Sequence, residues 1–167
     1  MLKAVQINLH HSKAASASLV RQLSDEDLDV ALIQEPWVNN SAVLGLGTSG
    51  KLLYNAGGDR PRAGIVFRKT VKFLPIPYLC TDDLVAAYVE IPGKQGKKMV
   101  VCSAYLPGDL PDPVPQLAAL VEYCEDQRTD LLLGCDANSH HTSWGSTDIN
   151  LRGELLNDFF LSRNLKS

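Results

Sequence analysis

The sequence predicts an α/β fold whose sheets are mixed rather than purely parallel. Short, continuous apolar runs of strand length alternate with longer segments in which apolar residues recur at helical spacing. The middle of the chain holds several strand-like runs joined by turns rich in Gly and Pro, which is the pattern of an antiparallel meander. The 167 residues are a single-domain length, expected to bury roughly 70% of the unfolded chain's surface.

The first half of the chain begins with a strand, a helix and a second strand. We expect the first strand at residues 2–8 and a helix that Ser12 caps and that extends to about residue 27. The second strand is expected at residues 30–35. Further strands are expected around residues 51–54, 63–69, 71–76, 84–91 and 98–105, with a loop at 39–50 and a hairpin turn at 92–96. The run at 71–76 contains a proline and is therefore expected at a sheet edge.

The last third returns to an alternation of helix and strand. Asp112 and Pro113 are expected at the N-cap and the first position of a helix. The five apolar or small residues 131–135 read as a strand buried on both faces. A final helix is expected at 151–165.

Four apolar runs end on a side chain that can do chemistry. These end residues are Asn8, Glu35, Tyr105 and Asp136, and Asn138 follows Asp136 with one residue between them. Strand ends in layered α/β proteins are where ligands bind, so we expect these side chains to converge. Their carboxylate and amide oxygens suit Mg²⁺ or Mn²⁺ better than zinc or iron. The set indicates metal-assisted attack on a phosphate.

Two pairs of histidines lie beside these positions. His10 and His11 are expected to be loop or capping residues, because adjacent side chains of a strand point to opposite faces. His140 and His141 follow Asn138 and are expected to support the site without a catalytic role. Taken singly, an Asn or Asp at a strand end is a common turn former. The case for a site therefore rests on the joint occurrence of these residues.

The net charge is −3, which argues against a generic nucleic-acid-binding module. The charge is nevertheless uneven. Residues 109–158 are strongly acidic, whereas residues 51–72 carry six cations against one acid. The six cations are Lys51, Arg60, Arg62, Arg68, Lys69 and Lys72. Such a distribution predicts a phosphate-contacting rim beside an acidic metal centre, although scattered surface lysines explain it nearly as well.

The cysteines and the apolar runs indicate an intracellular protein. Cys80, Cys102, Cys124 and Cys135 show no C-x-x-C spacing, and we expect reduced thiols that act as small hydrophobic residues. No apolar run approaches the roughly 20 residues of a membrane span, so no membrane partner is expected. The N-terminus reads as a strand without a basic region and an apolar signal core.

The strand ends together resemble a known superfamily. They read Gln-Ile-Asn8, Ile-Gln-Glu35-Pro-Trp, Ser-Ala-Tyr105-Leu-Pro and Gly-Cys-Asp136-Ala-Asn138-Ser-His-His. In this order they resemble the endonuclease/exonuclease/phosphatase superfamily, in particular the apurinic-type endonuclease domain of non-LTR retrotransposons of the R1 kind. The resemblance implies a four-layer α/β sandwich of two mixed, mostly antiparallel sheets flanked by helices.

The resemblance also implies a role for each strand-end residue. Asn8 and Glu35 would hold Mg²⁺ or Mn²⁺. Tyr105 would face the scissile phosphate and stabilise charge in the transition state. Asp136 would orient or deprotonate the attacking water, and Asn138 would hold that water or the phosphate. These residue types can provide what phosphodiester hydrolysis needs.

The activity implied by the resemblance is that of a nuclear, Mg²⁺-dependent DNA endonuclease. Such an enzyme nicks a double-stranded DNA target and leaves a 3′-hydroxyl that primes a reverse transcriptase domain further along the parent polyprotein. Two alternatives stay open. One is a phosphatase or phosphodiesterase of the same fold that acts on lipid or sugar phosphates, and the other is a catalytically incomplete fragment that serves only in binding or assembly.

One departure from the superfamily pattern concerns the C-terminus. Members continue with strands that carry an Asp and a Ser-Asp-His ending, and residues 1–167 form a single domain without that portion. A truncated chain, an ordered portion of a longer chain and a natural remnant copy each explain this. The missing strands are expected to leave an unpaired sheet edge that favours self-association.

Overall fold

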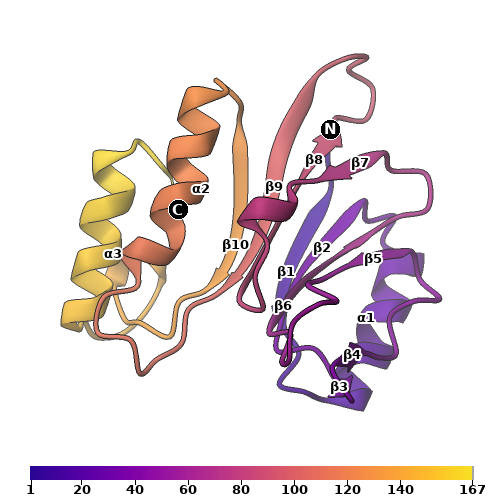
Figure 1. Ribbon diagram of the computed structural model, residues 1–167, viewed down its shortest axis with the longest axis horizontal. Coiled ribbons are helices and arrows are strands. Elements are labelled where there is room, and N and C mark those ends of the chain that lie inside the picture. Colours follow the sequence, from indigo (N-terminus) through magenta and orange to yellow (C-terminus); the bar gives the residue numbers. More distant parts are fainter. Residues whose placement is uncertain (167) are drawn as a thin grey trace.

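The chain folds into two four-stranded sheets that pack face to face, with helices on both outer sides (Figure 1). The computed structural model describes residues 1–166. One outer helix covers the first sheet, and two helices lie side by side on the second (Figure 1). The layers are therefore helix, sheet, sheet and helix, as predicted.

Each sheet is mixed and holds one parallel pair of strands. The first sheet has the order β1-β2-β6-β5, built from β1 (Ala4–Asn8), β2 (Val30–Gln34), β6 (Ala63–Phe67) and β5 (Lys51–Leu53). The second has the order β10-β9-β8-β7, built from β10 (Leu131–Asp136), β9 (Lys98–Tyr105), β8 (Leu84–Glu90) and β7 (Phe73–Pro75). β1 pairs in parallel with β2 and β10 with β9, and the other pairs are antiparallel.

Within residues 1–166, three α-helices and three short elements complete the fold. The helices are α1 (Lys13–Asp25), α2 (Val114–Asp126) and α3 (Leu151–Ser162). The short elements are the 3₁₀ turns η1 (Pro77–Leu79) and η2 (Thr142–Trp144) and a two-stranded hairpin of β3 (Val38–Asn39) and β4 (Ala42–Val43). The hairpin lies partly within residues 39–50, for which the sequence predicts a loop, so this part of the prediction is wrong.

The helix starts follow from their capping residues. Ser12 caps α1 as predicted, because its hydroxyl accepts a hydrogen bond from the Ala15 amide at 3.2 Å. At α2 the prediction is off by one residue. Pro113 takes the N-cap position, and the Asp112 carboxylate accepts from the Val114 amide at 2.9 Å. α3 ends at Ser162, three residues before the predicted end.

The core has three parts, one between each pair of layers. The central part fills the space between the sheets with side chains such as Leu32, Phe67 and Val101. Leu19 of α1 packs on the outer face of the first sheet. Leu120 of α2 packs on the outer face of the second.

The prediction that strand 131–135 is buried on both faces is wrong. β10 is an edge strand, since within residues 1–166 it pairs with β9 alone, and all of its residues except Gly134 are half-buried. An apolar run indicates that a strand has side chains to bury. It does not indicate how many strands pair with that strand. The predicted edge position of the proline-containing run is confirmed, because β7 lies at the opposite edge of the same sheet.

A buried hydrogen-bond network joins the sheets directly beneath the strand ends. The fully buried Gln34 side chain donates to the Ser103 hydroxyl at 2.9 Å and to the Gly134 carbonyl at 3.2 Å. Its side-chain oxygen accepts a hydrogen bond from the Gln6 side-chain Nε2 at 2.6 Å. The Ser103 hydroxyl in turn donates to the Ile33 carbonyl at 2.7 Å. Such bonds hold the two sheets in one register, because a slip would leave buried polar groups unpaired.

The cysteines are free thiols, as expected. Cys102 and Cys124 are buried, while Cys80 and Cys135 are half-buried. Burial raises the pKa of Cys124 to about 11 and that of Cys135 to about 12. Across residues 1–166 we find no helix that is long and apolar enough to cross a membrane.

We predict that Gly134→Ala destabilises the fold by about 1–3 kcal/mol, because the added methyl forces apart closely packed sheets. A Cβ at this position would lie 2.8 Å from the Leu32 Cβ and 2.9 Å from the Gln6 Cγ. Gly47→Ala is the matched control, since a Cβ there meets no atom within 4 Å. Guanidinium unfolding measures both variants, and equal midpoints would contradict the prediction.

We also predict that the thiols react slowly at pH 8 in the folded protein. The thiolate is the reactive form, and the raised pKa of Cys124 and Cys135 keeps both thiols protonated until the pH approaches 11 to 12. Iodoacetamide labelling followed by mass spectrometry should be at least about 100-fold faster in guanidinium, where a thiol has a pKa near 8.5. Equal labelling rates at Cys124 in the two conditions would refute this.

Candidate active site at the strand ends

The two parallel strand pairs bring the predicted residues to one end of the molecule. In the first sheet Asn8 lies opposite Gln34, the residue before Glu35. In the second sheet Tyr105 lies opposite Asp136. Parallel strands end on the same side of a sheet, so each pair presents two strand ends together. The face-to-face packing of the sheets then places the pairs side by side.

Asn8 and Asp136 are in direct contact across the two sheets. The Asn8 Nδ2 donates a hydrogen bond to Asp136 Oδ2 at 2.5 Å, and the Asn8 Oδ1 accepts from the His10 amide at 2.8 Å. The other carboxylate oxygen of Asp136 accepts from the Asn138 amide at 3.3 Å. Hydrogen bonds to an ionised carboxylate are strong, so both oxygens of Asp136 are held in fixed directions.

Glu35 lies just beyond β2 in a left-handed backbone conformation, with φ of +46°. Its amide donates to the Arg62 carbonyl and its carbonyl accepts from the His11 amide, both at 2.8 Å. These bonds hold a conformation that costs a non-glycine residue about 1–3 kcal/mol. Its carboxylate is about 20% exposed and lies 3.6 Å from His10 Nδ1 and 3.5 Å from His11 Nε2.

His10 and His11 lie in the loop between β1 and α1, as predicted, but their rings also flank the Glu35 carboxylate. Sequence reasoning missed this contact. Both histidines have positive φ, at +47° and +55°, so the alternation of strand side chains does not apply to them. The only hint in the sequence was their position directly after the strand that ends on Asn8.

Tyr105 closes β9, and its surroundings favour the protonated hydroxyl. Burial and the charge of Glu35 raise the pKa of Tyr105, while a hydrogen bond with Asn138 and the charge of Arg62 oppose the shift. The phenol therefore stays neutral well above pH 7. A neutral hydroxyl can donate a hydrogen bond to an anionic oxygen.

Asn138 and the two loops next to it are held by a residue that sequence reasoning missed. The Asn138 Nδ2 donates to the Leu106 carbonyl at 3.0 Å. The buried Arg152 guanidinium donates to that same carbonyl and to the Ala137 carbonyl, each at 3.1 Å, and also to the Leu110 carbonyl. Arg152 thus ties the segment after β9 to the segment after β10. Its place on the apolar face of the predicted helix, four residues before Leu156, was the available signal.

His140 and His141 stabilise the loop that follows Asn138. His140 Nδ1 lies 2.9 Å from the Asp148 carboxylate. The His141 ring accepts from the Ser143 amide at 3.1 Å, and its centroid lies 5.1 Å from that of Trp144. These contacts fit the expected supporting role, which stays a prediction.

The donor set suits a hard cation that shares its site with a phosphate. Among the residues that the structure describes, no three His, Cys, Asp or Glu side chains are grouped closely enough to hold a metal by themselves. Glu35 and Asn8 instead offer one carboxylate and one amide oxygen. Mg²⁺ commonly takes one or two carboxylates and completes its shell with water and substrate phosphate. The residues at the strand ends therefore fit Mg²⁺ or Mn²⁺ bound together with its substrate.

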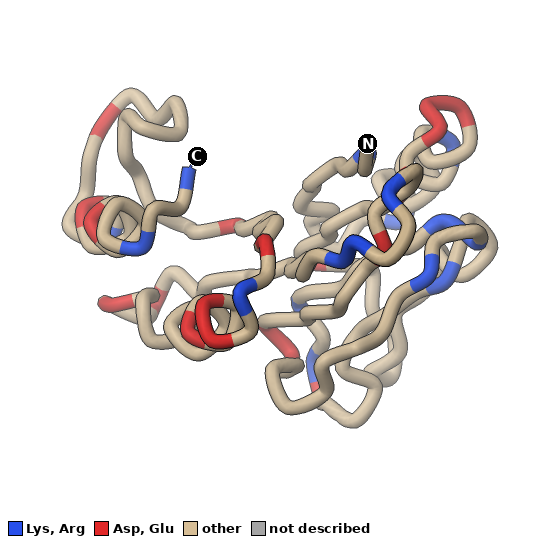
Figure 2. The backbone as a smooth tube through the Cα atoms, turned by 90° about the horizontal axis from the view of Figure 1, so that it is seen from above, with Lys and Arg blue, Asp and Glu red and all other residues tan. Residues whose placement is uncertain are grey.

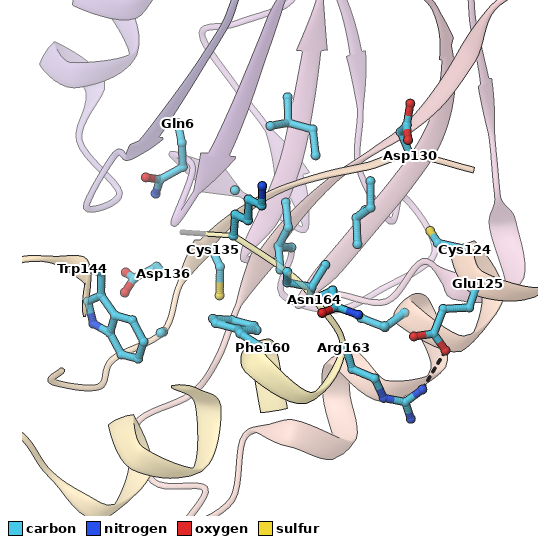
Figure 3. A pocket seen from close by; sticks show the side chains of 18 of the residues that line it. Gln6, Cys124, Glu125, Asp130, Cys135, Asp136, Trp144, Phe160, Arg163 and Asn164 are labelled. Carbon is cyan, nitrogen blue, oxygen red and sulfur yellow. Dashed lines mark hydrogen bonds and ion pairs between the residues drawn. The ribbon is translucent and has the colours of Figure 1, made fainter. Parts of the chain in front are cut away.

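A groove of about 1140 Å³ runs along the free edge of β10 and reaches the strand ends (Figure 3). β10 forms one wall, and the ends of α2 and α3 form the other. Cys135, Trp144 and Phe160 contribute apolar surface, and Asp136 lies among the lining residues. The groove lies beside the outer edge of β10, which within residues 1–166 pairs with β9 alone.

The charge distribution agrees only in part with the predicted basic rim. Red segments mark acidic residues along the two-helix side of the molecule, and blue segments are frequent on the opposite side (Figure 2). Within residues 51–72, Arg62 pairs with Asp83, Arg68 with Asp27 and Lys72 with Glu90. These ion pairs neutralise half of the six cations. The remaining three are Lys51, Arg60 and Lys69, all of them exposed.

Comparisons with known proteins found one similar family and similar solved folds. Residues 99–167 match the endonuclease-reverse transcriptase family. A search of curated proteins found no match. The endonuclease domain of TRAS1, a telomere-specific non-LTR retrotransposon, is 25% identical with a TM-score of 0.77, over 98% of this chain and 71% of that one.

A second solved structure is similar in fold alone. It is an endonuclease/exonuclease/phosphatase family protein from Leptotrichia buccalis C-1013-b, 14% identical with a TM-score of 0.57. That likeness covers 98% of this chain and 73% of the other. The family match includes Tyr105, Asp136 and Asn138, and the two structural matches extend over nearly the whole chain, with Asn8 and Glu35 in the first sheet. The sequence resemblance is thereby confirmed: residues 99–167 are similar to the endonuclease-reverse transcriptase family, and nearly the whole chain has the fold of the TRAS1 endonuclease domain.

Proposed function

We propose that this chain is the greater part of a retrotransposon endonuclease domain that hydrolyses one phosphodiester bond of a double-stranded DNA target. The proposed product is a nick with a 3′-hydroxyl, from which a reverse transcriptase domain of the parent protein primes synthesis in the nucleus. The observation that carries the proposal is the Asn8–Asp136 hydrogen bond, which joins the strand ends of the two sheets into one site. The similarity to the TRAS1 endonuclease domain supports DNA as the substrate.

Asp136 is the proposed acceptor for the proton of the attacking water. Hydrogen bonds from Asn8 and Asn138 hold its carboxylate in the direction that a general base at this position needs. Tyr105 is the proposed donor to a phosphate oxygen, because its raised pKa keeps the hydroxyl protonated. Asn138 contacts both of these groups and would orient the water or the phosphate.

Glu35 and Asn8 would hold Mg²⁺ or Mn²⁺. The cation, when bound, neutralises charge on the phosphate oxygens and so lowers the cost of attack by a nucleophile. His10 and His11 flank the Glu35 carboxylate and restrict its directions. Their contacts support a fixed ligand geometry at Glu35.

The free edge of β10 favours a second property, which is self-association. An unpaired strand exposes a row of backbone donors and acceptors, and the half-buried apolar residues of β10 line the groove beside it. We propose that copies of this chain associate along this edge. If the chain has no catalytic activity and serves only in assembly, we expect it to assemble through this same edge.

The proposed function predicts that the chain nicks supercoiled plasmid DNA in Mg²⁺ and that EDTA abolishes the nicking. Asp136→Asn should lower the rate at least about 100-fold, because loss of a general base costs about 10²–10⁴-fold. Glu35→Gln should be rescued in part by high Mn²⁺. Asp126→Asn, at the exposed C-terminal end of α2, is the control and should nick at the normal rate.

The outcomes of the nicking assay separate the candidate functions. Hydrolysis of inositol phosphates without nicking would identify a phosphatase of the same fold. If this chain is inactive but a C-terminally longer version nicks, the function belongs to the longer domain and this chain is an incomplete catalyst. Inactivity of both toward DNA would refute the proposal.

The proposed self-association predicts a mass that rises with protein concentration in sedimentation equilibrium. Leu131→Lys should weaken the association, because it places a charge at the start of the free edge strand. Leu74→Lys is the matched control, since Leu74 is 63% exposed on β7 at the other edge of the same sheet. Equal effects of the two variants, with both folded by circular dichroism, would contradict association through β10.

A further inference from the structure

An ion pair between Arg62 and Asp83 lies beside the strand ends and belongs to neither the metal site nor the general base. The Arg62 Nε lies 2.5 Å from Asp83 Oδ1, and its Nη2 lies 2.6 Å from Asp83 Oδ2. This is a bidentate contact between side chains that are only 28% and 18% exposed. Such a fork-to-fork contact fixes orientation as well as distance.

Each member of the pair also holds one site residue through its backbone. The Arg62 carbonyl accepts from the Glu35 amide at 2.8 Å, and the Asp83 carbonyl accepts from the Tyr105 amide at 2.8 Å. Arg62 precedes β6 in the first sheet, and Asp83 precedes β8 in the second. The ion pair therefore connects the two sheets at the positions that carry Glu35 and Tyr105.

The Arg62 side chain makes a further contact with Tyr105. Its Cζ lies 5.0 Å from the centroid of the Tyr105 ring, within the range of a cation–π interaction. The guanidinium is thus held by Asp83 at its edge and covers the ring of Tyr105. A lysine would keep the charge but would lose both the bidentate contact and the flat stacking surface.

We infer that the Arg62–Asp83 ion pair is a positioning device that sets the Tyr105 hydroxyl and the Glu35 carboxylate relative to each other across the two sheets. The inference rests on the proposed function for its effect on cleavage, and on the contacts alone for its effect on structure. An isolated surface ion pair contributes little. This one differs because it is partly buried, bidentate and connected to two site residues.

A double-mutant cycle in the nicking assay tests the effect on cleavage. Arg62→Met should lower kcat at least about 10-fold with little change in KM, and Arg62→Lys should recover only part of the loss. In a Tyr105→Phe background, Arg62→Met should cost clearly less than it does in the wild type, because the hydroxyl that Arg62 positions is already gone and only the effect on Glu35 remains. Arg60→Met is the matched control, since it removes an exposed cation from the same loop.

Two results of this cycle would overturn the inference. One is an effect of Arg62→Met that is unchanged in the Tyr105→Phe background. The other is a rise in KM alone that equals the effect of Arg60→Met, because Arg62 would then act only as a general attraction for DNA.

A second double-mutant cycle tests the inference by protein stability and does not require that the chain cleave DNA. Guanidinium unfolding is measured for Arg62→Met, Asp83→Asn and Tyr105→Leu, singly and in pairs. The inference expects non-additive changes for both pairs that include Arg62, because each pair is in contact. Additive changes would overturn it even if the chain nicks DNA. If the wild-type chain and its longer version fail to nick, the proposed function fails and the unfolding cycle still reports the coupling.

Discussion

The site depends on a single buried amide, the side chain of Gln34. It is fully buried between the sheets, and it bonds to Gln6 of its own sheet and to Ser103 and Gly134 of the other. Gln34 directly precedes Glu35, so the position of the proposed metal ligand is set by bonds that cross the central core. Removing one partner would leave a desolvated polar group, at a cost of about 1–3 kcal/mol. The close approach of the sheets is possible because Gly134 carries no Cβ at the contact.

This arrangement divides the candidate site between two sheets. The helices lie on the outer sides of the sheets and do not join one sheet to the other. The first sheet supplies Asn8 and Glu35, and the second supplies Tyr105 and Asp136. The connections that hold the halves together at the strand ends include the Asn8–Asp136 hydrogen bond, the Gln34 network and the Arg62–Asp83 ion pair. The amides of Arg62 and Ala63 also donate to the Asp82 carbonyl between the two sheets. A change that separates the sheets by a fraction of an ångström would therefore alter both stability and the geometry of catalysis. Core substitutions far from the site should therefore lower activity in this protein, because they can shift one sheet relative to the other. A site built on one sheet would be less sensitive to them.

The sequence predicted what depends on short-range pattern, and missed what depends on chain topology. The strand 98–105, the Ser12 cap and the polar strand ends follow from local periodicity and capping chemistry, and all three match the structure. The edge position of β10, the Arg152 contacts with three loop carbonyls and the flanking of Glu35 by His10 require knowledge of which segments meet. An arginine on an apolar helix face was visible as an anomaly. Its partners are backbone carbonyls. Every residue has a backbone carbonyl, so the sequence does not indicate which ones Arg152 contacts.

The free edge of β10 and the proposed base are parts of one strand, and this couples them. Asp136 ends β10 and lies among the residues that line the groove. A strand or a second chain placed along that edge would pair with the exposed backbone of β10 and remove water from the groove. Removal of water strengthens the hydrogen bonds that Asn8 and Asn138 donate to the Asp136 carboxylate, because they would act in a medium of lower dielectric. Whatever covers the edge of β10 therefore affects how firmly the Asp136 carboxylate is oriented, so assembly and catalysis in this fold are expected to change together.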